Sequence, residues 1–155
     1  MALFLVRKAC DPMNHVECEW RISNGGRGLY ELTQKLQNWL REVGAWEGWA
    51  NLFVPHTSAS LLVQENADPD VREDILDYFA RLVADGDPRF RHANEGSDDM
   101  AAHLRSVLTQ NSLVIPVRAG RAALGVWQGV FLFEHRVRPR DRQVLVSFQG
   151  VVREE

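Results

Sequence analysis

Histidine and carboxylate side chains that could bind a metal are concentrated in a few short stretches of this sequence. His56 lies between two apolar stretches, His92 lies in a polar stretch, and His103 follows eleven residues later. Three carboxylates accompany them in the same or neighbouring stretches: Glu65, Glu95 and Glu134. Imidazole binds zinc, nickel, iron and copper, and carboxylates add oxygen ligands. Three protein ligands would leave a coordination position for water or substrate, as a catalytic metal requires.

The spacing of these residues leaves ordinary structural roles open. His92 and His103 are eleven residues apart, unlike the i, i+4 pair that places two ligands on one helix face. A hydrogen-bonded histidine at a strand end (His56) and an ordinary helix histidine (His103) would explain much of the pattern. Both a metal site and a purely structural set of histidines therefore remain possible from the residues alone.

Other polar residues also have two interpretations. Asp68 is expected first as a helix N-cap, and a helix N-terminus would explain Asp98 and Asp99. Trp127 is more typical of a core residue than of a platform for substrate. Glu134 follows an apolar run and needs water or a partner. Three arginines also have two interpretations: Arg138, Arg140 and Arg142. They lie in a solvated loop, or they hold an anionic group, since guanidinium pairs well with phosphate.

The elements that must position these residues follow from hydrophobic periodicity. Alternation predicts a half-buried strand over 15–23, and apolar runs predict further strands over 49–55, 60–64, 113–117, 122–135 and 143–152. Helical spacing predicts helices over 29–43, 68–82 and 97–108, the second beginning at Asp68-Pro69. We expect an α+β class: a single compact domain with a largely antiparallel β-sheet or sandwich and about three helices.

Composition limits the class of protein. The chain has 155 residues, 45% of them hydrophobic, which suffices for one core. We expect residues 1–14 to be an N-terminal extension and 15–155 to be the domain. With 18 basic and 21 acidic residues the net charge is −3, which argues against nucleic-acid binding. No apolar run is long enough for a membrane span and no signal peptide is evident, so a cytoplasmic location is expected, with Cys10 and Cys18 as ordinary thiols.

The ordered motifs resemble those of one protein family. The first comprises Val54–Ser60 and Glu65–Val71 with Asp74, and the second runs from His92 to His103. The third comprises Ser112–Val117, Gly120-Arg121 and Gly125–Gly129, and the set ends with Glu134–Arg136, Arg142 and Gln149-Gly150. In order and spacing, from about Val16 to Gly150, this set resembles the YjbQ-like family.

The resemblance implies an α+β fold of YjbQ type, a homotrimer, and a divalent transition metal, zinc in the first instance, held mainly by histidines. Carried over residue by residue, it makes His56, His92 and His103 the metal ligands, and Glu65, Glu95 and Glu134 the acid/base or supporting carboxylates. The substrate-binding candidates are the remaining polar and aromatic residues of the motifs: Thr57, Ser58, Ser60, Asn66, Trp127, Gln128 and Arg142.

Two functions follow as hypotheses. The first is a metal-binding enzyme with the secondary thiamine-phosphate synthase activity described for the family. In that reaction a pyrimidine diphosphate condenses with a thiazole phosphate. The second is a non-catalytic trimeric module that binds a phosphorylated or other anionic metabolite, since the sequence shows no recognisable nucleophile constellation.

Overall fold

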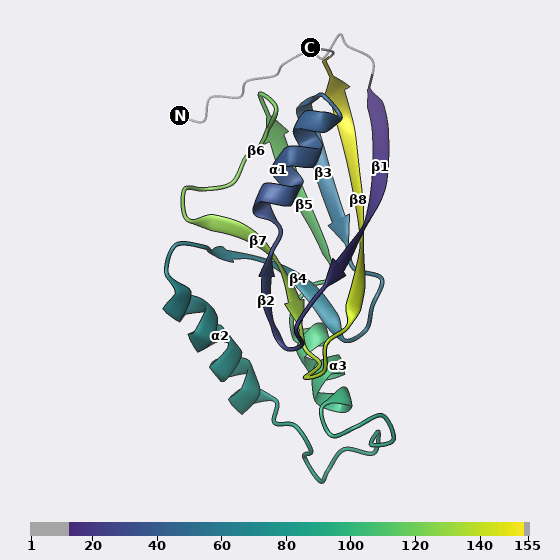
Figure 1. The fold of residues 1–155 in the computed structure, drawn as a ribbon, viewed down its shortest axis with the longest axis vertical. Coiled ribbons are helices and arrows are strands. Elements are labelled where there is room, and N and C mark those ends of the chain that lie inside the picture. The colour runs from purple at the N-terminus through teal and green to yellow at the C-terminus, as the bar shows by residue number, and fades with distance from the viewer. Residues whose placement is uncertain (1–12, 154–155) are drawn as a thin grey trace, which may run out of the picture.

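The computed structural model describes residues 13–153, so most of the expected extension at 1–14 lies outside the described residues. Strands and helices alternate irregularly along the chain (Figure 1). The elements are, in order, β1 (Asn14–Ser23), β2 (Gly28–Glu31), α1 (Thr33–Glu42), β3 (Ala45–Phe53), β4 (Ala59–Glu65), α2 (Pro69–Leu82), α3 (Asp99–Leu108), β5 (Ser112–Arg118), β6 (Arg121–Ala122), β7 (Gln128–Glu134) and β8 (Asp141–Val152).

The strands form two sheets in which every pairing is antiparallel. The larger sheet has the order β1-β8-β3-β5-β6, and the smaller has the order β2-β7-β4. The expected α+β class with three helices and antiparallel sheets is therefore confirmed. Among residues 13–153, no helix is both long and apolar enough to cross a bilayer.

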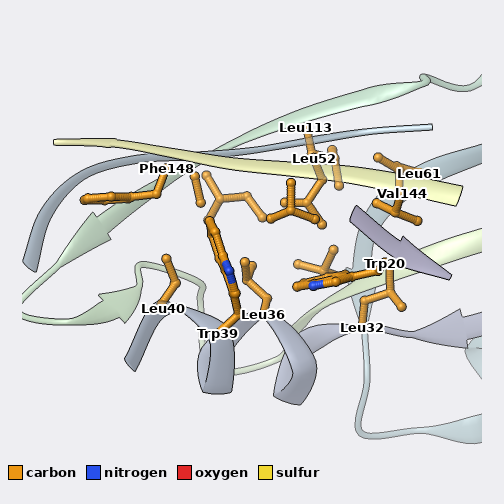
Figure 2. Packing of buried hydrophobic residues seen from close by; sticks show 14 of the residues in the cluster. Trp20, Leu32, Leu36, Trp39, Leu40, Leu52, Leu61, Leu113, Val144 and Phe148 are labelled. Atoms are coloured by element: carbon orange, nitrogen blue, oxygen red, sulfur yellow. The ribbon is translucent and has the colours of Figure 1, made fainter. Parts of the chain in front are cut away.

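The main core lies between α1 and the five-stranded sheet. Leu36, Trp39 and Leu40 form the buried face of α1 and point toward the strands that carry Leu52 and Phe148 (Figure 2). The indole of Trp39 also meets that of Trp20 on β1 edge to face, with ring centroids 6.4 Å apart. This arrangement is favourable for aromatic pairs and fixes the helix against the sheet.

Two predictions made from local sequence are confirmed, a helix N-cap and a strand. Asp68 caps α2 as expected: its Oδ1 accepts a hydrogen bond from the amide of Asp70, 2.9 Å away, and Pro69 occupies the first helical turn. The alternating segment from His15 to Ser23 lies within β1, which pairs with β8 along its whole length. Residues 15–23 therefore form the predicted strand.

Two predicted elements were wrong because pairing between distant segments overrides local pattern. Residues 29–31 do not begin the first helix; they belong to β2 and pair with Phe131–Phe133 of β7. The predicted strand over 122–135 is divided instead between β6 and β7, which belong to different sheets. Hydrophobic periodicity alone does not reveal such a change of sheet, because it does not indicate which distant strand each piece pairs with.

The outer helices bury few large apolar side chains. Val107 and Leu108 are exposed on α3, which buries Asp99 and Arg105 beside the small residues Ala101 and Ala102. No residue of α2 is fully buried, although Phe79 meets Phe133 edge to face at 5.3 Å. These helices therefore rest on the small sheet through polar contacts and a few rings.

Candidate metal site

Three of the polar side chains converge beside the N-terminal half of α3. The Nε2 of His92 lies 2.7 Å from Oδ2 of Asp99, and the Nε2 of His103 lies 3.4 Å from the same oxygen. One ligand atom from each residue lies within 4.8 Å of the others. The side chain of Asp99 is 3% exposed, while those of His92 and His103 are 42% and 32% exposed. The group therefore has a buried carboxylate base and imidazoles that reach solvent.

Asp99 and His103, the two more buried residues of the group, are each held in place by a contact with a residue outside the group. The Nδ1 of His103 lies 3.0 Å from the carbonyl oxygen of Thr57, so Nδ1 carries a proton and Nε2 is the nitrogen that faces Asp99. Arg136, which is buried, donates from Nη1 to Oδ1 of Asp99. Such contacts fix the tautomer and the orientation of metal ligands in known sites.

Arg136 also ties the loop before α3 to the strand end after β7. Its Nε donates to Asp98 Oδ2 at 3.1 Å, and its Nη2 donates to the carbonyl oxygen of Glu95 at 2.8 Å. Burial alone would raise the pKa of Asp98. The hydrogen bonds from the amide of Val137 and from Arg136 outweigh it, so the pKa is lowered and the carboxylate stays ionised.

The donor set fits a divalent transition metal. Two imidazole nitrogens and one carboxylate oxygen form the protein half of a catalytic zinc site or of a two-histidine, one-carboxylate iron site. Arg136 occupies Oδ1 of Asp99 and leaves Oδ2 facing the histidines. The partial exposure of His92 and His103 leaves room on the solvent side for water or substrate.

The structure places His56 outside this group of ligand atoms. Its Nε2 accepts a hydrogen bond from the amide of Gln143 at 2.9 Å, so that nitrogen is occupied by β8. Partial burial and the charge of Arg142 lower the pKa of His56, and Glu134 opposes them. His56 is therefore a neutral histidine in the loop between β3 and β4, adjacent in the chain to Thr57, whose carbonyl contacts His103.

Glu134 is fully buried and all its hydrogen-bonding capacity is used within the fold. Its Oε2 accepts from Arg142 Nε at 2.6 Å and from Asn24 Nδ2 at 2.9 Å. Its Oε1 accepts from Arg142 Nη2 at 2.7 Å and from the amide of Arg136 at 2.9 Å. Arg142 Nη2 also donates to Ser58 Oγ at 3.0 Å. These contacts indicate that Glu134 and Arg142 form a buried structural ion pair, rather than a free acid, base or substrate contact.

A second buried polar group lies on the opposite face of the small sheet. Ser60 Oγ and His135 Nε2 are 2.9 Å apart, and both residues are completely buried. Burial, together with the positive charges of Arg105, Arg142 and Arg27, lowers the pKa of His135 to about 3, so the imidazole is neutral. Because neither residue reaches solvent, this pair is not a substrate contact in the described fold.

The remaining candidates lie elsewhere. Glu65 pairs in register with Gln128, whereas Ala59, at the other end of β4, pairs with Glu134. Seven residues of strand separate these ends by about 20 Å. The end of β4 far from the histidines carries four candidates: Glu65, Asn66, Trp127 and Gln128. Trp127 is 65% exposed, so it is not a core residue. Glu95 is exposed, and only its backbone oxygen contacts Arg136.

Sequence reasoning missed Asp99 and Arg136 as members of the site. Asp99 was attributed to the helix dipole, yet Asp99 and His103 are four residues apart and therefore share one face of α3. That i, i+4 spacing was a signal available in the sequence. Arg136 gave none, because only the fold brings it to Asp99.

The fold and the site together define a small α+β protein with two antiparallel sheets and a solvent-accessible histidine–aspartate group. A family model described as UPF0047 protein YjbQ-like matches residues 19–151. The chain therefore belongs to the YjbQ-like family, as the ordered motifs indicated.

Curated relatives and solved structures agree with this assignment. UPF0047 protein sll1880 of Synechocystis is 50% identical over 131 residues, covering 84% of this chain and 89% of the relative. UPF0047 protein YjbQ of Escherichia coli O157:H7 is 39% identical and covers 83% and 94%. The crystal structure of hypothetical protein APE1520 from Aeropyrum pernix superposes with a TM-score of 0.81 at 32% identity, covering 88% and 99%.

The buried pair of Glu134 and Arg142 yields a stability prediction. Replacing Glu134 by Leu leaves the Arg142 charge buried without a partner, and we expect the free energy of unfolding to fall by about 3–5 kcal/mol. The double variant Glu134→Leu/Arg142→Met should lose clearly less than the sum of the single losses, as measured by urea denaturation. The control Glu65→Leu should change stability by less than about 1 kcal/mol. Additive losses would contradict the coupling.

The neutral state of His135 predicts a dependence of stability on pH. Its pKa is about 3 in the fold and 6.5 in the unfolded chain, so the unfolded state binds more protons between these values. The corresponding stability is complete above pH 6.5 and is lost as the pH falls from 6.5 toward 3. At pH 4.5 the parent should have lost about 3 kcal/mol more than His135→Gln, measured by urea denaturation. His15→Gln should follow the parent; parallel curves for all three proteins would refute the prediction.

Proposed function

We propose that this protein is a metal-dependent enzyme, with zinc bound by His92, Asp99 and His103. The observation that supports this most directly is the convergence of three ligand atoms within 4.8 Å on a buried, oriented carboxylate. The site differs from the three-histidine set expected from the sequence in using Asp99 in place of His56. Zinc accepts this mixture of imidazole and carboxylate readily.

The residues around the site have distinct tasks in this proposal. Arg136 holds Asp99 so that a single oxygen faces the histidines, and the Thr57 carbonyl keeps the proton of His103 on Nδ1. Bound there, zinc supplies Lewis-acid stabilisation of negative charge on a phosphate oxygen. His92, the most exposed of the three, borders the solvent side on which a substrate would approach.

For the reaction, we propose the condensation of a pyrimidine diphosphate with a thiazole phosphate. The thiazole nitrogen forms a bond to the pyrimidine methylene carbon while the bond from that carbon to the diphosphate oxygen breaks. The attacking nitrogen carries no proton, so the main demand on the protein is to stabilise the charge of the departing diphosphate. Glu134 is therefore not required as a base, which agrees with its complete engagement by Arg142, Asn24 and Arg136.

Two guanidinium groups near the site are suited to this demand. Arg138 and Arg140 lie in the exposed loop between β7 and β8, two and four residues after Arg136. Within residues 13–153 neither guanidinium group has a hydrogen bond to a protein acceptor, and both line a surface hollow with Glu95 and Asp98. Arginine side chains stabilise phosphate through paired hydrogen bonds.

We also propose that the chain assembles as a homotrimer through the uncovered face of the five-stranded sheet. The opposite face is covered by α1, but the outer positions of three adjacent strands carry exposed apolar side chains, Trp49, Val114 and Leu145. Large apolar side chains gathered on one exposed sheet face favour a protein interface there.

Metal content tests the site. Protein purified untagged and incubated with zinc should retain about one zinc per chain by mass spectrometry. His92→Ala, Asp99→Asn and His103→Ala should lose it, whereas the matched control His56→Ala should keep it, with unchanged circular dichroism in all variants. A metal-free parent, or retention by His92→Ala, would show that the assignment is wrong.

Turnover is tested with the same proteins. The zinc-loaded parent should release pyrophosphate and form thiamine phosphate, and the rate should fall at least about 100-fold in His103→Ala while His56→Ala stays within about tenfold of the parent. If zinc binds as expected and no thiamine phosphate forms, this reaction is excluded while the metal site stands.

The oligomeric state tests the sheet face. Light scattering of the parent should give three times the 17.7 kDa of one chain. Trp49→Asp should shift the mass to one chain, because it places a charge within the apolar patch. Val107→Asp, at an equally exposed position on α3, should remain trimeric. A monomeric parent, or equal behaviour of the two variants, would rule out this face.

A further inference from the structure

A separate cavity of about 600 Å³ lies at the end of the molecule opposite the histidines. Its walls come from α1, the start of β3, the turn between β5 and β6, and Arg153 just after β8. Figure 1 shows α1 at one end of the fold and α3, which carries His103, at the other. This volume falls within the range of about 300–1,000 Å³ typical of small-molecule sites.

Three guanidinium groups border this cavity, and no carboxylate is among its lining residues within 13–153. Arg41 makes only a weak contact with Asn38 Oδ1 at 3.4 Å, and Arg121 has no side-chain hydrogen bond. The guanidinium of Arg153 lies 4.0 Å from the ring centroid of Trp46, as a cation–π pair. All three charges therefore lack an ion-pair partner in the part of the chain described.

Two acidic residues, Glu42 and Glu47, lie next in the chain to residues that line the cavity. Glu47 accepts a hydrogen bond from the amide of Ala119 at 3.2 Å, which directs one carboxylate oxygen to the turn. Glu42 lines a neighbouring hollow that shares Arg41 and Arg153 with the cavity, and it forms no ion pair with either. The cavity thus has a positive lining in a chain whose net charge is −3.

The walls are fixed to one another by hydrogen bonds. Gln37 donates to the carbonyl oxygen of Gly120 at 2.9 Å and accepts from the amide of Ala122 at 3.2 Å, which joins α1 to the turn. Gln37 and Arg41 lie four residues apart and share one helix face. The amide of Arg153 donates to the carbonyl oxygen of Gly44 at 2.8 Å. The three arginines therefore project from elements whose relative positions are set.

We propose that this cavity is a binding site for a small polyanion that carries phosphate groups, such as a linear triphosphate. Guanidinium groups form paired, charge-assisted hydrogen bonds with phosphate oxygens, and several clustered groups favour a multiply charged ligand over a single anion. Binding also removes the mutual repulsion of Arg41, Arg121 and Arg153. The site is independent of the proposed metal centre.

Calorimetric titration with sodium triphosphate at low ionic strength tests this proposal. The parent should show saturable binding, and its tightest component should be at least about tenfold weaker in Arg41→Gln/Arg121→Gln. The control Arg21→Gln/Arg81→Gln removes the same charge from exposed positions elsewhere and should bind like the parent. His103→Ala should also bind like the parent, which separates this site from chelation at the metal centre.

Several outcomes would overturn the proposal. These are the absence of saturable binding, an equal loss in the two double variants, or a loss in His103→Ala. A shortened chain that ends at Arg153 tests whether the acidic residues Glu154 and Glu155, which lie outside the described residues, compete with the ligand. If triphosphate binds only to this shortened chain, the natural occupant is the segment that follows Arg153 and a ligand site is excluded.

Discussion

The carboxylate of Glu134, completely shielded from water, connects the parts of this fold that must meet for the histidines to converge. It joins β7 to Arg142 of β8, to Asn24 after β1, and to the amide of Arg136. A buried charge is tolerated only when it is paired and fully hydrogen-bonded, so these contacts form together or not at all. The backbone amide of Arg136 belongs to this network, and its guanidinium group donates to Asp99. The geometry of the candidate metal site thus depends on an ion pair that takes no part in its chemistry.

The two ends of the molecule differ in charge and in what they can bind. Near α3, a buried aspartate and two partly exposed histidines offer ligands to a cation. Beyond α1, three arginines that have no carboxylate partner among residues 13–153 line a cavity suited to anions. The five-stranded sheet runs between them, and its strands β3 and β8 are long enough to keep the two sites apart. Family membership defines the fold, and these two sites show where its chemistry should be sought.

Sequence reasoning succeeded where a residue acts on its immediate neighbours. Asp68 caps α2 because its side chain reaches an amide two residues away, and the alternation within β1 reflects a pleat that needs no distant information. The requirement that Glu134 find a partner was also correct. It failed where distant segments decide the outcome: residues 29–31 pair with β7, and the stretch 122–135 changes sheet. Tertiary structure also places His56 outside the group formed by His92, Asp99 and His103, with its Nε2 accepting from an amide of β8.

The sequence by itself determined the α+β class, the strand that begins the described fold, the capped start of α2 and the family, because these follow from period, capping and ordered motifs. Only the tertiary structure decided which polar residues share a site. It brought Arg136 to Asp99 across 37 residues, separated Trp127 and Glu65 from the histidines by the length of β4, and assembled Arg41, Arg121 and Arg153 around one cavity. The physical reason is that hydrogen bonds and ion pairs act over a few ångströms. Residues far apart in the sequence come that close only through the fold, and no local sequence pattern indicates which of them will meet.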